Sequence, residues 1–134
     1  MIVLDASVAA AWLLPEEDSE AAETLIARLS QRSPVPSLFW HELRNILVMA
    51  ERRGRIAAGE AAAAMGRLRR LPLEDAGAGA DGAILALATA RGLTAYDAAY
   101  LALAQERGLP LATLDQSLAR AARQEGVALL GPLA

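Results

Sequence analysis

The sequence contains no cysteine, no lysine and a single histidine, His41. Without cysteine the chain can form neither disulfides nor thiolate nucleophiles nor thiolate metal sites. No apolar run approaches the ~20 residues of a membrane-spanning helix, because charges interrupt the alanine-rich sequence every few residues. The chain start has neither the basic segment nor the small-residue cleavage site of a secretory signal. We therefore expect a cytoplasmic protein whose polar chemistry rests mainly on oxygen ligands.

The length of the chain limits the number of domains, and its charge distribution limits the kinds of partner. A chain of 134 residues fits one compact domain, which we expect to span residues 1–134. The net charge of −3 gives no overall attraction to nucleic acid. All basic residues are arginines, however, and seven fall in one stretch: Arg44, Arg52, Arg53, Arg55, Arg67, Arg69 and Arg70. These arginines could contact phosphates, or they could solvate the outer faces of two amphipathic helices.

Short apolar segments alternate with helical patterns along the chain. The segments with the length of buried strands are 1–4, 33–37, 71–73, 109–113 and 127–130. Prolines restrict the second and third of these to short or edge strands. The helical patterns cover a piece through Leu13, then about 15–29, 38–53, 57–70, 83–91, 95–107 and 117–125, with Ser37 suited to an N-cap. This alternation predicts an α/β protein with a parallel sheet.

Four acidic residues border apolar stretches, where an acid is least expected: Asp5, Glu42, Asp97 and Asp115. Asp5 and Asp115 each follow a predicted strand, so both should lie at the carboxyl edge of the sheet, where open α/β sheets bind ligands. The alternatives are a turn residue for Asp5 and a helix N-cap for Asp115. If the fold brings the four carboxylates together, they form a divalent-metal site.

Glu42 falls among candidate core positions of its helix, three residues after Phe39 and four before Ile46. A buried carboxylate without a partner is costly, so Glu42 needs an arginine, a backbone donor or a cation. A metal is the simplest partner, and a salt bridge at the helix edge is the alternative. Asp97 lies three residues after Thr94, close to the spacing of a capping box, so capping and metal coordination both stay open.

The residues around these acids have ordinary explanations. We expect Tyr96 and Tyr100, which flank Asp97, to be packing residues. His41 neighbours Glu42 in the sequence and so points to a different side of the helix, as a surface or interface residue. Other acids lie at helix starts or in loops, where acids are common, and Glu17 is the first of them to reconsider.

Four motifs together resemble those of PIN domains. They are a hydrophobic-Asp-Ala-Ser start, a proline a few residues upstream of His-Glu-Leu, the segment Tyr-Asp-Ala-Ala-Tyr-Leu-Ala-Leu-Ala, and Ala-Thr-Leu-Asp. More narrowly, the chain resembles the VapC toxins of bacterial toxin–antitoxin pairs. The similarity in motif order and helix–strand alternation spans essentially the whole chain. It implies a three-layer α/β/α sandwich around a five-stranded parallel sheet with strand order 3-2-1-4-5.

The resemblance also implies which residues carry the chemistry. The family's catalytic acids fall on Asp5, Glu42, Asp97 and Asp115. Its supporting positions fall on Ser7 and Thr113. The metal ligands, direct or through water, would be Asp5, Asp97 and Asp115, while Glu42 would help to orient the nucleophile.

The implied activity is that of an endoribonuclease that depends on Mg²⁺ or Mn²⁺ and cleaves RNA phosphodiester bonds with metal-activated water. Hard oxygen ligands suit Mg²⁺. The resemblance further implies a transfer or ribosomal RNA target, a cognate antitoxin as protein partner, a homodimer that assembles further with the antitoxin, and no membrane attachment.

Two other functions stay open. A structure-specific DNA nuclease is one, although the chain is too short for the extra helical arch and DNA-binding elements. A protein that chiefly binds an antitoxin, with weak or silent nuclease activity, is the other. A phosphotransferase of the haloacid-dehalogenase kind ranks low, because it requires Asp-x-Asp after the first strand and position 7 here is serine.

Overall fold

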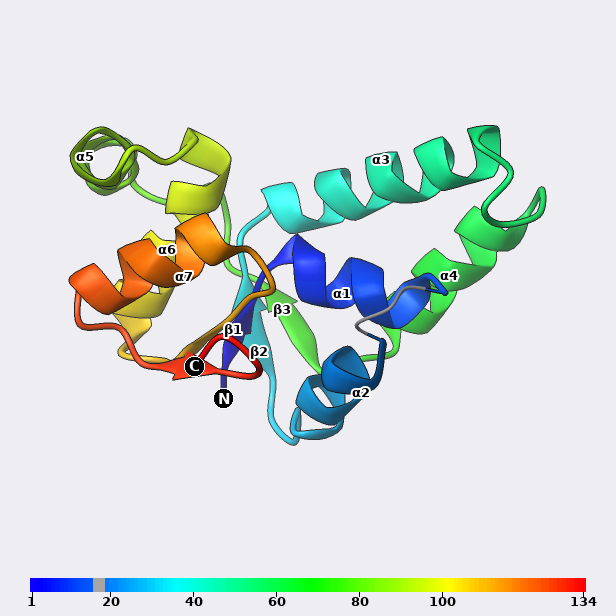
Figure 1. Ribbon diagram of the computed structural model, residues 1–134, viewed down its shortest axis with the longest axis horizontal. Coiled ribbons are helices and arrows are strands. Elements are labelled where there is room, and N and C mark those ends of the chain that lie inside the picture. The colour runs from blue at the N-terminus through cyan, green and yellow to red at the C-terminus, as the bar shows by residue number, and fades with distance from the viewer. Residues whose placement is uncertain (16–18) are drawn as a thin grey trace.

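A computed structural model describes residues 1–15 and 19–134 and shows short strands between helices (Figure 1). The strands are β1 (Val3–Leu4), β2 (Ser33–Val35), β3 (Leu73–Asp75), β4 (Leu111–Ala112) and β5 (Leu129–Leu130). The helices are α1 (Ala6–Leu13), α2 (Ser19–Ala27), α3 (Leu38–Arg52), α4 (Glu60–Arg69), α5 (Asp81–Arg91), α6 (Ala95–Arg107) and α7 (Gln116–Gln124). The predicted helix–strand alternation is confirmed, whereas the predicted helix start at Glu16 and Glu17 lies outside the described residues.

The strands form two parallel sheets rather than the single five-stranded sheet we expected. One sheet has the order β1-β4-β5 and the other pairs β2 with β3. Between β1 and β2 the amide of Ile2 donates to the side-chain oxygen of Ser33 at 3.3 Å. Pro34, in the middle of β2, has no amide hydrogen to continue a ladder. A side-chain bond thus takes the place of backbone pairing, and the predicted continuous sheet is wrong at this junction.

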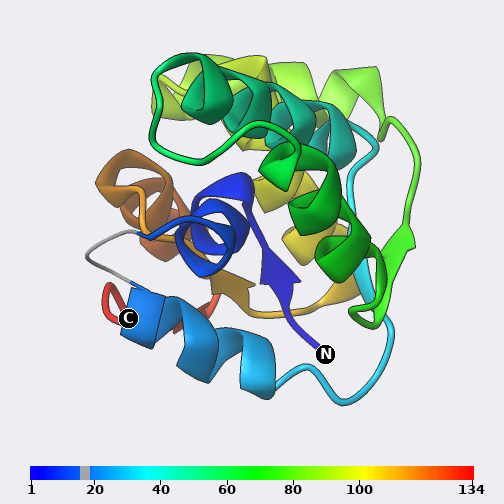
Figure 2. The same cartoon turned by 90° about the vertical axis from the view of Figure 1, so that its right-hand side faces the viewer.

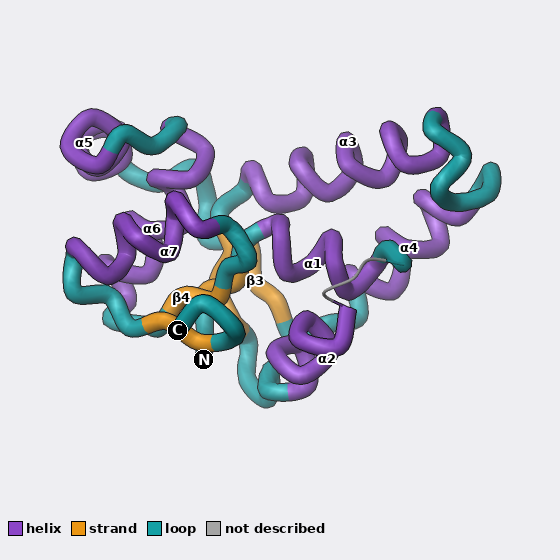
Figure 3. Tube along the Cα trace, viewed as in Figure 1, coloured by secondary structure: helices purple, strands orange, loops and turns teal. Residues whose placement is uncertain are grey.

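Helices cover the strands on both sides, as a three-layer arrangement requires. In Figures 1 and 2 the strands lie between α6 and α7 on one side and α1, α2 and α4 on the other; Figure 3 shows the same division by secondary structure. The α6 helix packs on β1, β2 and β4, and α1 packs against α2, α3 and α4. No helix in the described part of the chain is long and apolar enough to cross a membrane.

The buried strands explain why the sheet centre forms the core. Val3, Leu4, Leu111 and Ala112 are fully buried, because β1 and β4 are covered by helices. Ser37 does not cap α3 as predicted. Its own backbone is already helical, and its hydroxyl donates to Asp75 at 2.7 Å.

The hairpin of α3 and α4 uses some of its arginines for its own structure. The Arg69 guanidinium lies 3.8 Å from the ring centroid of Trp40, which also packs edge-on against Phe39. Arg44 donates to the carbonyl of Trp40 at 3.2 Å and approaches exposed His41 at 2.9 Å. Arg69 therefore joins α4 to α3, whereas these contacts of Arg44 lie within α3. His41 is at the surface as predicted.

Candidate active site

Asp5 stands at the carboxyl end of β1, where the strand turns into α1. Its backbone is extended, and its Oδ1 accepts hydrogen bonds from the amides of Ser7 at 3.1 Å and Val8 at 3.4 Å. The Asp5 amide donates to the carbonyl of Ala112 at 3.2 Å, which continues the pairing of β1 with β4. Asp5 is therefore an N-cap that also lies at the sheet edge, and only 4% of its surface is exposed.

Two hydroxyl groups hold the Asp5 carboxylate. Ser7 donates to Oδ1 at 2.5 Å, and Thr113 donates to Oδ2 at 2.6 Å. Each hydroxyl in turn accepts a backbone amide from the segment after β4: Leu114 bonds Ser7 Oγ at 2.9 Å, and Asp115 bonds Thr113 Oγ1 at 3.0 Å. Each hydroxyl accepts a backbone amide with one lone pair, and its own hydrogen remains available for the ionised Asp5 carboxylate.

Burial and hydrogen bonding act in opposite directions on Asp5. Burial raises the pKa of Asp5 to about 6, the donors Ser7, Thr113 and Val8 lower it, and the nearby charge of Asp97 raises it. The carboxylate is therefore mostly ionised at neutral pH. Among the described residues, Oδ2 accepts one hydrogen bond, which leaves a lone pair for a cation.

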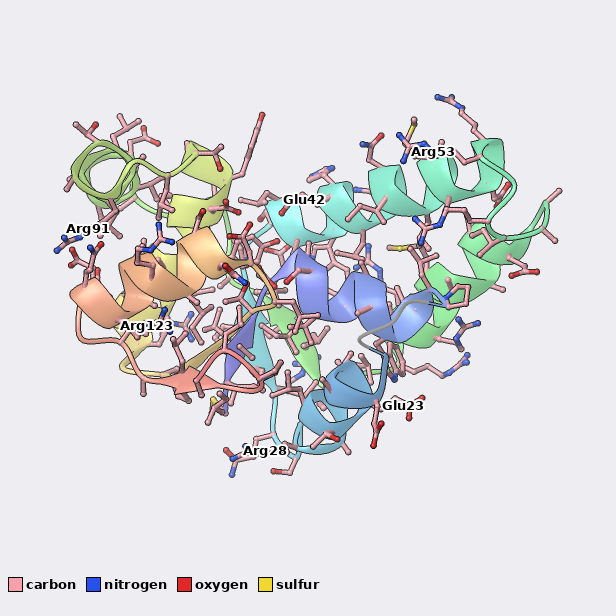
Figure 4. The ribbon with its side chains drawn as sticks, in the orientation of Figure 1. Glu23, Arg28, Glu42, Arg53, Arg91 and Arg123 are labelled. Atoms are coloured by element: carbon pink, nitrogen blue, oxygen red, sulfur yellow. The ribbon has the colours of Figure 1, made fainter. Side chains whose placement is uncertain are left out.

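Glu42 is partly buried near the start of α3, above the N-terminal end of α1 (Figure 4). Its Oε1 accepts a hydrogen bond from the Tyr100 hydroxyl at 2.6 Å, which connects α3 to α6. Burial raises the pKa of Glu42, the Tyr100 bond lowers it and the Asp97 charge raises it. The predicted need for a partner is met by a tyrosine, which was not among the partners the sequence suggested. The signal available was the position of Tyr100, three residues after Asp97 on the same helix face.

Asp97 lies in the first turn of α6, where Thr94 is the N-cap. The amide of Asp97 donates to Thr94 Oγ1 at 3.1 Å, so its backbone takes part in capping. No reciprocal capping-box bond from Asp97 to the Thr94 amide is present among the described residues. Burial raises the pKa of Asp97, and the charge of Asp115 raises it further. The Asp97 carboxylate thus interacts electrostatically with the other acids, and only the backbone amide of Asp97 takes part in the cap.

Asp115 is the N-cap of α7, which was the alternative we considered for it. Its Oδ1 accepts the Leu118 amide at 3.0 Å. The cap does not remove Asp115 from the site, because its amide is bonded to Thr113, the residue that donates to Asp5. Asp115 and Asp5 therefore occupy the same edge of the β1–β4 pair.

The four acids lie within electrostatic range of one another without forming a compact ligand cage. Asp97 raises the pKa of both Asp5 and Glu42, and Asp115 raises that of Asp97. In residues 1–15 and 19–134, no three histidine or acidic side chains are close enough to hold an ion together. Repulsion among carboxylates favours such spacing. The all-oxygen donor set nevertheless fits Mg²⁺, which usually takes one or two carboxylates and keeps several waters.

The two tyrosines beside Asp97 differ. Tyr100 is 1% exposed, so the packing prediction is confirmed for it, and it also binds Glu42. Tyr96 is 66% exposed, so the packing prediction is wrong for that residue.

Solved structures of other proteins share this fold. A structure of PAE2754 from Pyrobaculum aerophilum shares it with a TM-score of 0.72 and 25% identity, covering 94% of this chain and 81% of that one. The fold is also that of Mycobacterium tuberculosis VapC20, a sarcin-ricin loop cleaving toxin, with a TM-score of 0.69 and 17% identity over 98% of this chain and 100% of that one. No curated protein matches the sequence. The PIN domain family model matches residues 2–124, and the chain therefore belongs to the PIN-domain family.

Proposed function

We propose that the protein is an endoribonuclease that depends on Mg²⁺ or Mn²⁺ and serves as the toxin of a VapBC-like type II toxin–antitoxin pair. Family membership and the fold shared with VapC20, a toxin that cleaves the sarcin-ricin loop, support this proposal. The observation that carries it is the buried Asp5 carboxylate, fixed by the hydroxyls of Ser7 and Thr113 at the sheet edge. A buried acid held as an acceptor, with further acids in electrostatic range, is suited to a hard cation.

Each residue has a distinct role in the proposed reaction. Asp5, Asp97 and Asp115 would hold the cation, directly or through water, while Ser7 and Thr113 keep the Asp5 carboxylate in position. When bound, the cation supplies Lewis acidity toward water and toward the phosphate oxygens. Glu42 accepts a hydrogen bond from the attacking water and orients it.

In this proposal neither a histidine nor a lysine activates the attacking water. The single histidine, His41, is exposed and lies next to Arg44, and the chain has no lysine. Glu42 is held by Tyr100, which remains protonated because burial and the Glu42 bond raise its pKa far above the usual value. The orientation of Glu42 is thus set before the substrate binds.

We further propose RNA as the substrate, with a structured transfer or ribosomal RNA as the natural target. The protein partners are a cognate antitoxin and a second copy of the chain. These proposals rest on the similarity to VapC toxins.

Cleavage of total bacterial RNA by the purified protein, with Mg²⁺ or Mn²⁺, tests the proposal. Three parallel reactions complete the test: Asp5→Asn, wild type with EDTA, and Asp81→Asn, which changes an exposed acid at the start of α5. We expect discrete fragments from the wild type and Asp81→Asn, and none from the other two reactions. End mapping should find 5′-phosphates.

Two results would redirect the proposal. Cleavage of structured DNA in preference to RNA would identify a DNA nuclease. A folded wild type that binds the cation but cuts no RNA would indicate a protein that chiefly binds its antitoxin.

A further inference from the structure

Tyr96 is an exposed aromatic residue at the edge of the acidic site. The structure describes all five aromatic residues of the chain, and the other four are buried or partly buried. The other exposed large apolar residues in the described part are Met1, Val48 and Leu85. With 66% of its surface in water, the Tyr96 ring contributes little to the core.

The position of Tyr96 on α6 relates it to the site. Tyr96 precedes Asp97 directly and lies four residues before Tyr100, so the two tyrosines share one face of the helix. The hydroxyl of Tyr100 reaches Glu42 at 2.6 Å. Helical side chains lean toward the helix N-terminus, which places Tyr96 one turn before Tyr100, in the same first turn of α6 as Asp97.

An exposed aromatic ring in this position could stack on an unpaired base of a nucleic acid. The acids themselves repel phosphate in the absence of a cation, so a contact to a base would add to the hold on the strand. Unpaired bases stack on tyrosine, and such stacking tolerates any base because every base has a π face. Bases inside a duplex already stack on their neighbours and do not offer that face.

We propose that Tyr96 stacks on an unpaired base next to the scissile phosphate and so holds the RNA strand at the acidic site. This inference rests on the proposed ribonuclease function and adds a substrate-positioning residue to it. Tyr96 then helps to hold the RNA, while the acids carry out the chemistry.

Fluorescence of a base analogue tests the stacking directly and without cleavage. The probe is a short single-stranded oligouridine with one 2-aminopurine, mixed with the Asp5→Asn protein and Mg²⁺. We expect Tyr96 to quench the probe on binding. Tyr96→Phe should retain the quenching, whereas Tyr96→Leu, which is apolar but not aromatic, should lose it and bind on the order of tenfold more weakly. Leu85→Ala, at an exposed apolar position on α5, should behave as the parent.

Kinetics with the otherwise unchanged enzyme provides a second readout. On an RNA that the wild type cuts, Tyr96→Leu should raise KM on the order of tenfold and leave kcat nearly unchanged. The substitution is on an exposed first turn, so the melting temperature should change little. A duplex carrying the same 2-aminopurine should show no Tyr96-dependent quenching.

Several results would overturn the inference. Equal quenching by the Tyr96→Leu and parent proteins would do so, as would the absence of quenching by the parent. If Tyr96→Leu changed neither RNA binding nor KM, the ring would not contact RNA, and a protein partner would be the remaining candidate for its contact. These outcomes differ from failure of the proposed function, in which wild type cuts no RNA whatever the residue at position 96.

Discussion

The hydroxyl of Tyr100 donates a hydrogen bond to Oε1 of Glu42 at 2.6 Å and so joins α6 to α3. The bond lowers the pKa of Glu42, against the rise that burial and the charge of Asp97 produce. Because Tyr100 is itself buried, the bond fixes the Glu42 side chain from a rigid part of the core. Tyr100 is thus a positioning residue for an acid that we place in the reaction.

Tyr100→Phe removes this donor and keeps the ring. We expect the free energy of unfolding to fall by about 1 kcal/mol. The pKa of Glu42 should rise, so the acidic limb of the cleavage pH profile should move to higher pH. The measurements are urea unfolding and kcat/KM as a function of pH.

A control separates this effect from a general loss of stability. Ser33→Ala removes another buried hydroxyl, the acceptor of the Ile2 amide between β1 and β2. It should lower stability and leave the pH profile in place. An identical profile for Tyr100→Phe and wild type would show that the bond does not act on catalysis.

Thr113 joins Asp5 to the segment after β4, and its hydroxyl both donates and accepts. Thr113→Val keeps the approximate shape of this buried residue but removes the hydroxyl. The Asp5 oxygen then lacks a donor and the Asp115 amide lacks an acceptor. We expect a loss of about 1–3 kcal/mol in unfolding free energy and weaker Mn²⁺ binding by calorimetry. Thr113→Ser retains the hydroxyl and should restore most of both. Equal Mn²⁺ affinity in the valine variant would remove Thr113 from the site.

The buried Asp5 predicts how stability depends on pH in the metal-free protein. Its folded pKa, about 6, lies above the ordinary value of 3.8, so between these values the folded state binds more protons than the unfolded state. Stability should therefore fall as pH rises through this window. The Asp5 contribution to this fall is about 3 kcal/mol by neutral pH.

Urea unfolding in EDTA at a series of pH values measures this dependence. Burial also raises the pKa of Glu42 and Asp97, which act in the same direction. The difference between wild type and Asp5→Asn isolates the Asp5 part, because asparagine does not titrate. The variant should lose less stability than wild type across the window. Parallel curves would mean that Asp5 titrates near its ordinary value.

The strands, the helices and the placement of Asp5 were predictable because they depend on local patterns. A short apolar run followed by Asp-Ala-Ser predicts a strand that ends at a turn. The structure has the strand end there, but Asp5 is the N-cap of α1 and not a turn residue. Continuity of the sheet was not predictable in this way. It depends on whether β2 can donate along its full length to β1, and Pro34 together with the Ser33 side chain decides that.

The partner of Glu42 and the exposure of Tyr96 depend on contacts distant in sequence. Helical periodicity places Tyr96 and Tyr100 on one face, but it cannot tell where the neighbouring helices stop covering that face. Tyr100 is buried and Tyr96 is exposed, although both lie on this face. Similarly, Ser37 fits the composition of an N-cap, yet its contact with Asp75 of β3 takes its hydroxyl elsewhere.

A divalent cation should stabilise the fold, because it relieves repulsion among acids that raise one another's pKa. A ligand that binds only the folded state at 100 times its Kd adds about 2.7 kcal/mol. We expect the melting temperature to rise with saturating Mn²⁺ in wild type and in Asp81→Asn, and to rise less in Asp5→Asn. The rise should also shrink as pH falls below about 6, where Asp5 becomes protonated. An unchanged melting temperature in the folded wild type would exclude a site already arranged for the ion, and an equal rise in all three proteins would place the binding elsewhere.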